Sequence, residues 1–152
     1  MKFAESMKST YFTKYAVFKG RASQSEYVNY FLLELALIPL LIYPLQYPPD
    51  LTSLISIVVN IITLIPGMAL TSRRLHDTGH SFNVALKNWN YFGLFVITLN
   101  LPIHLSKTWT IFFLLVSFGC LIYSGYLLIN LLMKLFSKGQ LEANKYGDPP
   151  IQ

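Results

Sequence analysis

The stretch TSRRLHDTGHS, residues 71–81, gathers the side chains of this chain that are best suited to chemistry. It holds two arginines, two histidines and an aspartate, although Asp, Glu, Lys and Arg together make up only 12% of the sequence. The guanidiniums of Arg73 and Arg74 could form a fork for a phosphate or a carboxylate. His76 and Asp77 could support proton transfer.

The same stretch also has a structural interpretation. Basic side chains stabilise the last turn of a helix, where the helix dipole is negative. Arg73 and Asp77 have the i, i+4 spacing of a surface ion pair, and Gly79 predicts the end of the helix. A metal site could use His76 and His80, at i and i+4, together with Asp77. However, Gly79 between the two histidines predicts a break in the helix, and no third strong ligand is evident. We therefore expect no metal and no cofactor.

A second cluster, FKGRASQSEY, occupies residues 18–27. Ser23 followed by Glu26 has the spacing of a helix capping box, directly before an apolar run. That interpretation leaves Arg21 without a role in capping, close enough to the membrane to face an acidic lipid or a carboxylate.

Glu34 interrupts the apolar run that follows. A carboxylate within a membrane span is costly unless it is protonated or faces the interior of a helical bundle. Glu26, Tyr30 and Glu34 share one helical face, and Asn60 and Asn100 are possible polar partners in later spans. A functional site and plain hydrogen bonding between helices both remain open.

Apolar blocks predict the elements that position these residues. The chain has 152 residues, of which 53% are hydrophobic, and blocks of about 20 apolar residues match the thickness of a bilayer. We predict a single all-α membrane domain, 1–152, with a short interfacial helix at about 7–19 that carries an aromatic face beside lysines. Four transmembrane helices follow at about 27–47, 51–72, 88–105 and 110–133, and then a tail, 134–152.

The basic residues predict the orientation of these spans. Of 12 Lys and Arg residues, 11 fall before the first span, between the second and third spans, or in the tail; Lys107 is the exception. The positive-inside rule places those segments, and both termini, in the cytoplasm. Because the basic residues stand between apolar blocks, the net charge of +5 indicates topology, and we expect no nucleic-acid partner.

Three strings in this order resemble a known family: FKGRASQSEY, IPGMALTSRRLHDTGHS and NKYGDPP. They are similar to the bacterial membrane family called domain of unknown function 805, typified by the YhaH-like inner-membrane proteins. The resemblance implies a small four-helix protein of the bacterial inner membrane. It singles out Gly20, Arg21, Ser23, Ser25, Glu26, Arg73, Arg74, His76, Asp77, Gly79, Asn144, Tyr146 and Gly147.

The chain departs from the family pattern in places. The family usually has arginine where Gln24 stands and tryptophan where Val28 stands. After Ser81 it usually continues with a glycine and tryptophans, where this chain has Phe-Asn-Val. These departures weaken the case that the whole site of the family is retained.

Because the three motifs all fall on the predicted cytoplasmic side, we expect them to form one cluster, with Glu26 as a partner for Arg73 or Arg74. The expected function is non-enzymatic: the cluster binds an anionic lipid headgroup or a membrane-protein partner, with Asn144 and Tyr146 closing over it. Alternatives are an oligomeric transporter or channel for ions or small solutes that uses Glu34, and a toxin-immunity or regulatory interaction protein. A homo-oligomer and a purely architectural cluster also remain open.

Overall fold

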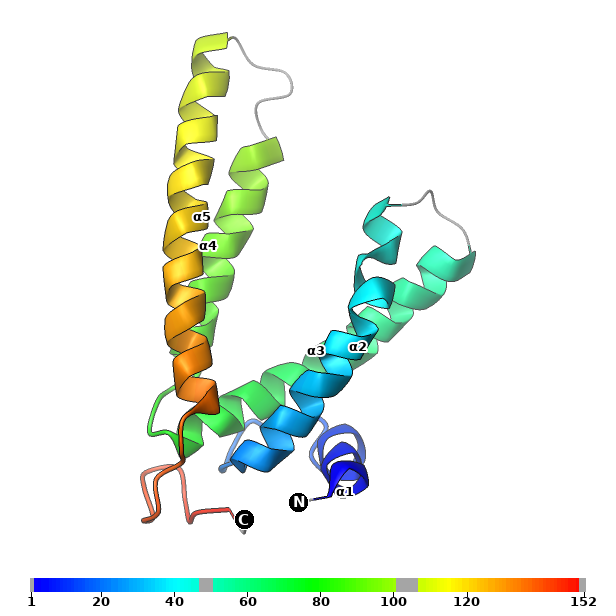
Figure 1. Ribbon diagram of the computed structural model, residues 1–152, viewed down its shortest axis with the longest axis vertical. Helices are drawn as coiled ribbons and strands as arrows, with labels where there is room; N and C mark the ends of the chain where they lie inside the picture. The colour runs from blue at the N-terminus through cyan, green and yellow to red at the C-terminus, as the bar shows by residue number, and fades with distance from the viewer. Residues whose placement is uncertain (1, 47–50, 101–106, 151–152) are drawn as a thin grey trace. The chain divides into compact units, whose positions relative to one another are not determined.

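The computed structural model describes residues 2–46, 51–100 and 107–150, and this part of the chain is all-helical (Figure 1). The helices are α1 (Phe3–Lys8), α2 (Gln24–Gln46), α3 (Leu51–Asp77), α4 (Asn83–Asn100) and α5 (Lys107–Phe136), and a π-helical turn, η1 (Ser9–Thr13), follows α1. Within these ranges there is no β-strand; one isolated bridge joins Asn144 and Gly147. The all-α class is therefore confirmed.

Two of the described helices are long and apolar enough to cross a membrane, by length and composition. These are the segments Leu54–Asp77 of α3 and Thr108–Phe136 of α5. Most of their apolar side chains are exposed: only 11% of the tested window in α5 is buried. Exposed helices of this kind indicate membrane association, because lipid would cover them.

The helix bounds differ from those predicted. The N-terminal helical segment covers residues 3–13 instead of 7–19. The predicted spans correspond to α2, α3, α4 and α5, and α3 runs beyond residue 72 because the charged turn RRLHD continues the helix. Residues 47 and 101–105, which the predicted first and third spans include, lie outside the described part. The four-span arrangement and its orientation stay predictions.

The described chain forms two compact units. One comprises residues 1–80 and 135–152, and the other comprises residues 81–134. The prediction of one membrane domain is untested by this division.

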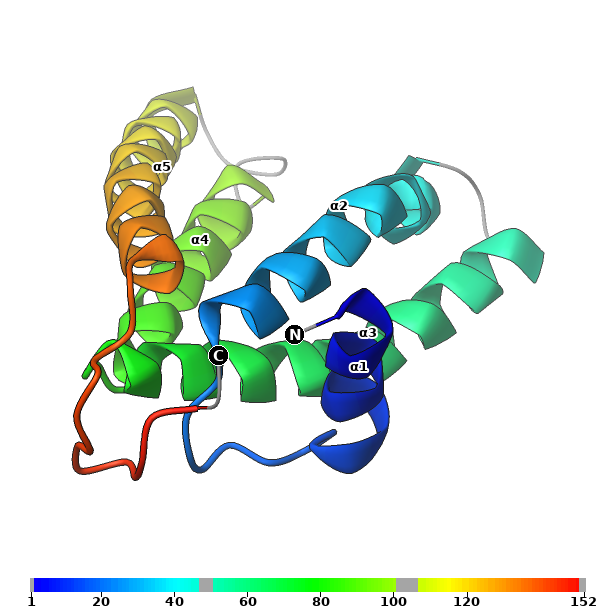
Figure 2. The same ribbon diagram turned by 60° about the horizontal axis from the view of Figure 1, so that its bottom comes forward.

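The first unit packs α2 beside α3, with α1 against α2 and η1 against α3 (Figure 2). Its apolar core is small and includes Tyr27, Leu70 and Leu75. The ring of Phe136 packs edge-on against Tyr27 and Phe31, with centroids 5.7 and 5.2 Å away. Buried polar and charged side chains, among them Ser6 and Asp77, fill much of the remaining interior. Ion pairs and hydrogen bonds must therefore organise this unit as much as apolar burial does.

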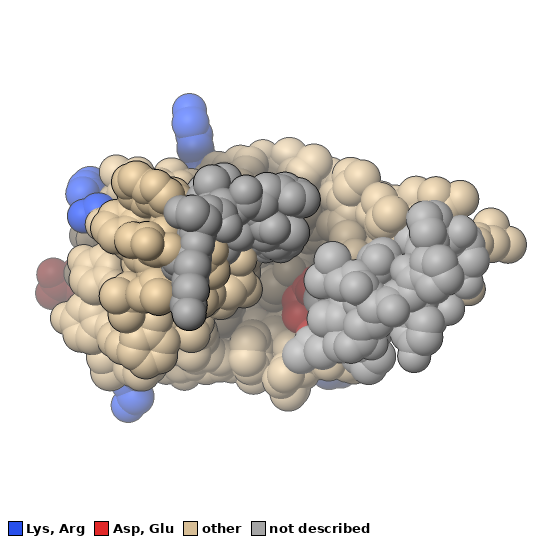
Figure 3. Space-filling model, turned by 90° about the horizontal axis from the view of Figure 1, so that it is seen from above, with Lys and Arg blue, Asp and Glu red and all other residues tan. Residues whose placement is uncertain are grey.

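The second unit pairs α4 with α5 through small polar side chains. Ser117 Oγ donates to Thr98 Oγ1 at 2.8 Å, and Ser124 Oγ donates to Asn88 Oδ1 at 3.3 Å. All four residues are buried. Many large apolar side chains of α4 and α5 are exposed. Figure 3 shows few red or blue residues on the face of the molecule that it presents. Small residues between helices and apolar residues outside are typical of membrane helix pairs.

Candidate functional site

The charged end of α3 is held in place by a glycine-terminated cap. The helix ends at Asp77, and Gly79 adopts φ +79°, a left-handed conformation that favours glycine. The amide of Gly79 donates to the His76 carbonyl at 3.0 Å, and that of His80 donates to the Leu75 carbonyl at 2.8 Å. This pair of bonds is a Schellman motif, which confirms the predicted helix end.

Two guanidiniums share the carboxylate of Asp77. Arg21 Nε donates to Asp77 Oδ1 at 2.9 Å, and Arg74 Nη1 pairs with Asp77 Oδ2. All three side chains are at most 4% exposed. We call Arg21, Arg74 and Asp77 the clasp. The predicted pairing of Arg73 with Asp77 is wrong, because the side chain at i−3 reaches Asp77 and Arg73 pairs with Glu26 instead.

Arg21 binds the C-terminal tail through backbone oxygens. Its Nη1 donates to the carbonyls of Glu142 at 2.7 Å and of Gly147 at 3.3 Å, and its Nη2 donates to the carbonyl of Gln140. With the bond to Asp77, these contacts engage all three of its nitrogens. Arg21 therefore fixes the path of the tail from residue 140 to 147.

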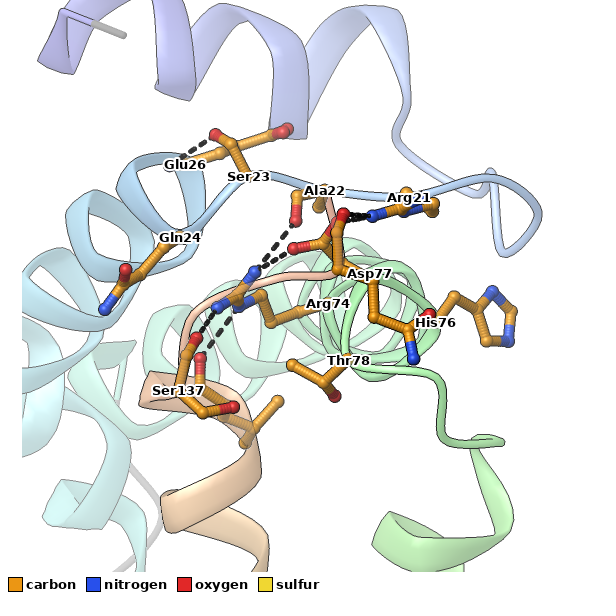
Figure 4. Close-up of polar contacts among 12 residues, drawn as sticks. Arg21, Ala22, Ser23, Gln24, Glu26, Arg74, His76, Asp77, Thr78 and Ser137 are labelled. Carbon is orange, nitrogen blue, oxygen red and sulfur yellow. Dashed lines mark hydrogen bonds and ion pairs between the residues drawn. The ribbon is translucent and has the colours of Figure 1, made fainter. Parts of the chain in front are cut away.

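Arg74 binds the start of the same tail. Its Nε donates to the carbonyl of Leu135 at 2.8 Å, its Nη2 to that of Ser137, and its Nη1 to that of Ala22 at 3.4 Å. Figure 4 shows the guanidinium of Arg74 between Ala22, Asp77 and Ser137. The clasp thus ties the segment before α2, the end of α3 and the chain after α5 together, and its donors are already engaged.

The tail closes over His76. The rings of His76 and Tyr146 stack with centroids 3.8 Å apart and an angle of 7° between their planes. Asn144 Nδ2 donates to the His76 carbonyl at 3.0 Å, while His76 Nδ1 lies 3.1 Å from the carbonyl of Gly20. The ring of His76 and the carboxylate of Asp77 therefore have different partners, which gives no support to proton transfer between them.

Arg73 faces another part of the first unit. Its Nη1 donates to Glu26 Oε1 at 3.3 Å, and Ser9 Oγ of η1 donates to the same oxygen at 3.0 Å. The Arg73 and Glu26 side chains are 1% and 4% exposed. The backbone amide of Glu26 donates to Ser23 Oγ at 3.2 Å, which is one of the two bonds of the predicted capping box. Glu26 is thus confirmed as a partner of Arg73.

A cavity of about 600 Å³ lies beside the clasp. Its lining comes from the cap and first residues of α2, from two members of the clasp and from the tail, and includes Ser23, Gln24, Ser25, Arg74, Asp77 and Lys138. Two guanidiniums and one carboxylate leave the clasp with an excess positive charge, to which Lys138 adds. The cavity can therefore attract an anion.

Glu34 lies on the face predicted for it. Tyr11 of η1 donates to Glu34 Oε1 at 3.3 Å, and the hydroxyl of Tyr30 also bonds to Glu34. Burial and the charge of Glu34 raise the pKa of Tyr11 above its ordinary value, so its hydroxyl remains a donor at neutral pH. Asn60 lies in α3, and the side chain of Asn100 is outside the described part. η1 therefore covers the polar face of α2 at both carboxylates.

Several contributors to the site could not be recognised from the sequence. They are the carbonyls of Leu135, Ser137, Gln140 and Glu142, because any residue type supplies a carbonyl. Gly139 is a further contributor, because it lies so close to the Asp77 carboxylate that a Cβ would collide with it. The only trace of this contact in the sequence is that the residue is a glycine. Among the described residues, no group of three His, Cys, Asp or Glu side chains is gathered in a way that could hold a metal ion.

A comparison with protein-family models gives one match. Residues 15–148 match the family described as "Protein of unknown function (DUF805)". Searches of the curated proteins and of the solved structures each found no match. The matched range includes α2 to α5 and the tail up to Asp148, and it begins after η1.

Proposed function

Because the chain belongs to the family of proteins of unknown function DUF805, whose description assigns no activity, we propose a function from the site itself. The protein is a non-enzymatic, multi-pass protein of the bacterial cytoplasmic membrane. It binds an anionic phosphate headgroup at its cytoplasmic side, in the cavity beside the clasp.

Length, composition and charge support the membrane part of this proposal. α3 and α5 contain segments able to cross a bilayer, and α2 and α4 are 23 and 18 residues long. Four crossings, with both termini inside, place 11 of the 12 basic residues in the cytoplasm. The clasp and its cavity then lie at the depth of lipid headgroups.

The cavity is the observation that carries the binding part. Its volume of about 600 Å³ suits a headgroup, and ligand sites are typically cavities in which a few polar groups converge. The surplus cation of the clasp, the ammonium of Lys138 and the positive end of the α2 dipole all favour an anion there.

This proposal changes the role of the arginines. The sequence suggests that Arg21, Arg73 and Arg74 hold the ligand, but the nitrogens of Arg21 and Arg74 already donate to Asp77 and to backbone carbonyls. Arg74 is a fixed part of the lining, and Arg21, which pairs with Asp77, adds its charge from outside the lining. Lys138 is the exposed cation of the lining that can turn towards a ligand.

The test compares Lys138→Gln with Lys19→Gln in the full chain, purified in mild detergent. Lys19 is an exposed lysine that does not line the cavity. Native mass spectrometry would count bound phosphatidylglycerol, with phosphatidylcholine as the uncharged comparison and inorganic phosphate as the free anion. We expect phosphatidylglycerol binding to weaken about tenfold in Lys138→Gln only, which corresponds to one charge contact.

Each arm has a distinct meaning. Binding of phosphatidylglycerol but not of inorganic phosphate identifies a lipid, and the reverse identifies a free anion. Equal binding by both variants, or no preference for phosphatidylglycerol over phosphatidylcholine, contradicts the proposal.

A further inference from the structure

Arg73 is a buried cation whose hydrogen bonds are incomplete. Its side chain is 1% exposed, and its one ion pair uses Nη1. Among the described residues, neither Nε nor Nη2 has a hydrogen-bond partner. A buried donor without a partner costs about 1–3 kcal/mol, and more on a charged group. Such an arrangement needs an explanation, and an ion or molecule that completes the bonds is one.

The two donors without partners, Nε and Nη2, lie side by side and can bind one ligand together. In the planar guanidinium, Nε and Nη2 present their N–H groups along the same edge, in parallel. That edge matches two oxygens of a carboxylate or a phosphate, which it can bind bidentately. The other edge, at Nη1, is taken by Glu26. Arg73 therefore offers a complete bidentate edge.

Polar groups of three elements meet at this residue. Arg73 belongs to α3, Glu26 to α2, and Ser9, which donates to Glu26, belongs to η1. Thr10, the next residue of η1, is fully buried, and its Oγ1 has no partner among the described residues. The unpartnered buried groups here are thus two guanidinium donors and one hydroxyl, which can donate or accept.

We propose that the open edge of Arg73 is a second anion site, which binds one singly charged oxyanion, such as a carboxylate or a phosphodiester. Arg73 does not line the cavity beside the clasp, so this site is separate from the one proposed above. Because the side chain is 1% exposed, a ligand can reach it only when the segments packed around it move aside.

Glu26 sets the charge that the site accepts. Its carboxylate neutralises Arg73, so the incoming anion meets a neutral pair and not a free cation. A doubly charged phosphate monoester would be repelled by Glu26 more strongly than a singly charged group. The site should therefore favour acetate or a phosphodiester over doubly charged phosphate.

The test observes Arg73 directly in the full chain. The ¹⁵N–¹H signal of its Nε is assigned as the one that disappears in Arg73→Lys, which keeps a cation for Glu26 but lacks the bidentate edge. Sodium acetate, inorganic phosphate at pH 8 and phosphatidylglycerol are titrated separately, against sodium chloride at equal ionic strength. We expect acetate and phosphatidylglycerol, but not phosphate at pH 8 or chloride, to shift the signal.

A second variant keeps the result decisive if Arg73→Lys does not fold. Glu26→Gln retains an oxygen for Arg73 and removes the competing charge, so we expect phosphate at pH 8 to bind about tenfold more tightly in it. A signal that no oxyanion shifts means that water completes the edge, which overturns the proposal. Lys138→Gln should leave these shifts intact, so this site and the clasp cavity can fail independently.

Discussion

Arg73 and Arg74 are neighbours of the same residue type, and both are buried, yet their surroundings differ. Arg74 donates to Asp77 and to three backbone carbonyls. Among the described residues, the Arg73 side chain donates only to Glu26, and its Nε and Nη2 have no hydrogen-bond partner. Consecutive helical residues point about 100° apart, so one faces the tail and the other faces α2 and η1. Two equally buried arginines thus differ in how many of their donors are engaged, and that difference is the basis for proposing a ligand at Arg73 and not at Arg74.

The largest effect should follow from removing the carboxylate of the clasp. Asp77→Ala leaves Arg21 and Arg74 buried without their shared counter-charge, which typically costs about 3–5 kcal/mol. We expect little folded protein in detergent, measured by size-exclusion chromatography and by an SDS unfolding titration followed by circular dichroism.

Asp148→Ala is the matched control, because it removes an exposed carboxylate from the same tail. It should leave the free energy of unfolding unchanged. If Asp77→Ala were equally harmless, the clasp would not hold the tail. Arg74 would then have no structural role to set against the open edge of Arg73.

A smaller effect should follow from crowding the clasp. A Cβ at Gly139 would overlap the Asp77 carboxylate, with its Cγ only 2.6 Å away. Gly139→Ala must displace either the tail or the carboxylate, and overpacking of this kind costs about 1–3 kcal/mol. The free energy of unfolding from the same SDS titration measures it.

Gly125→Ala in α5 is the comparison, because a Cβ there meets nothing within 4 Å. Alanine favours a helix over glycine by about 0.5–1 kcal/mol, so this variant should be neutral or more stable. Equal destabilisation by both variants would show that glycine flexibility, and not the clasp, is responsible.

Local patterns in the sequence predicted the local structure of the site. Ser23 and Glu26 predicted the start of α2, and Gly79 predicted the end of α3. The resemblance of three motifs to one family, together with the predicted topology, led us to expect one cluster, and Asn144 and Tyr146 do contact His76. Each of these features depends on neighbouring residues, or on strings specific enough to mark a family.

The sequence could not predict which partner each arginine takes. Asp77 lies at i+4 from Arg73 and i+3 from Arg74, and both spacings allow a pair. The choice depends on which side of α3 faces α2 and which faces the tail, and that is decided by packing between distant segments. The tail acceptors are carbonyls, which no residue type marks.

The smallest effect on the free energy of unfolding should come from the contacts around Arg73, where few hydrogen bonds are formed. Ser9→Ala removes the hydroxyl that donates to Glu26 Oε1, the oxygen that also accepts from Arg73. One such hydrogen bond contributes about 0.5–1.5 kcal/mol. A double-mutant cycle with Glu26→Ala, which removes the acceptor oxygen, separates the bond itself from other effects of Ser9 on η1. If Ser9 acts through Glu26, the two substitutions together should cost less than the sum of the two alone. Strict additivity in the SDS titration would mean that η1 is held elsewhere, for example through Tyr11 and Glu34, and that the layer over Arg73 is independent of its ion pair.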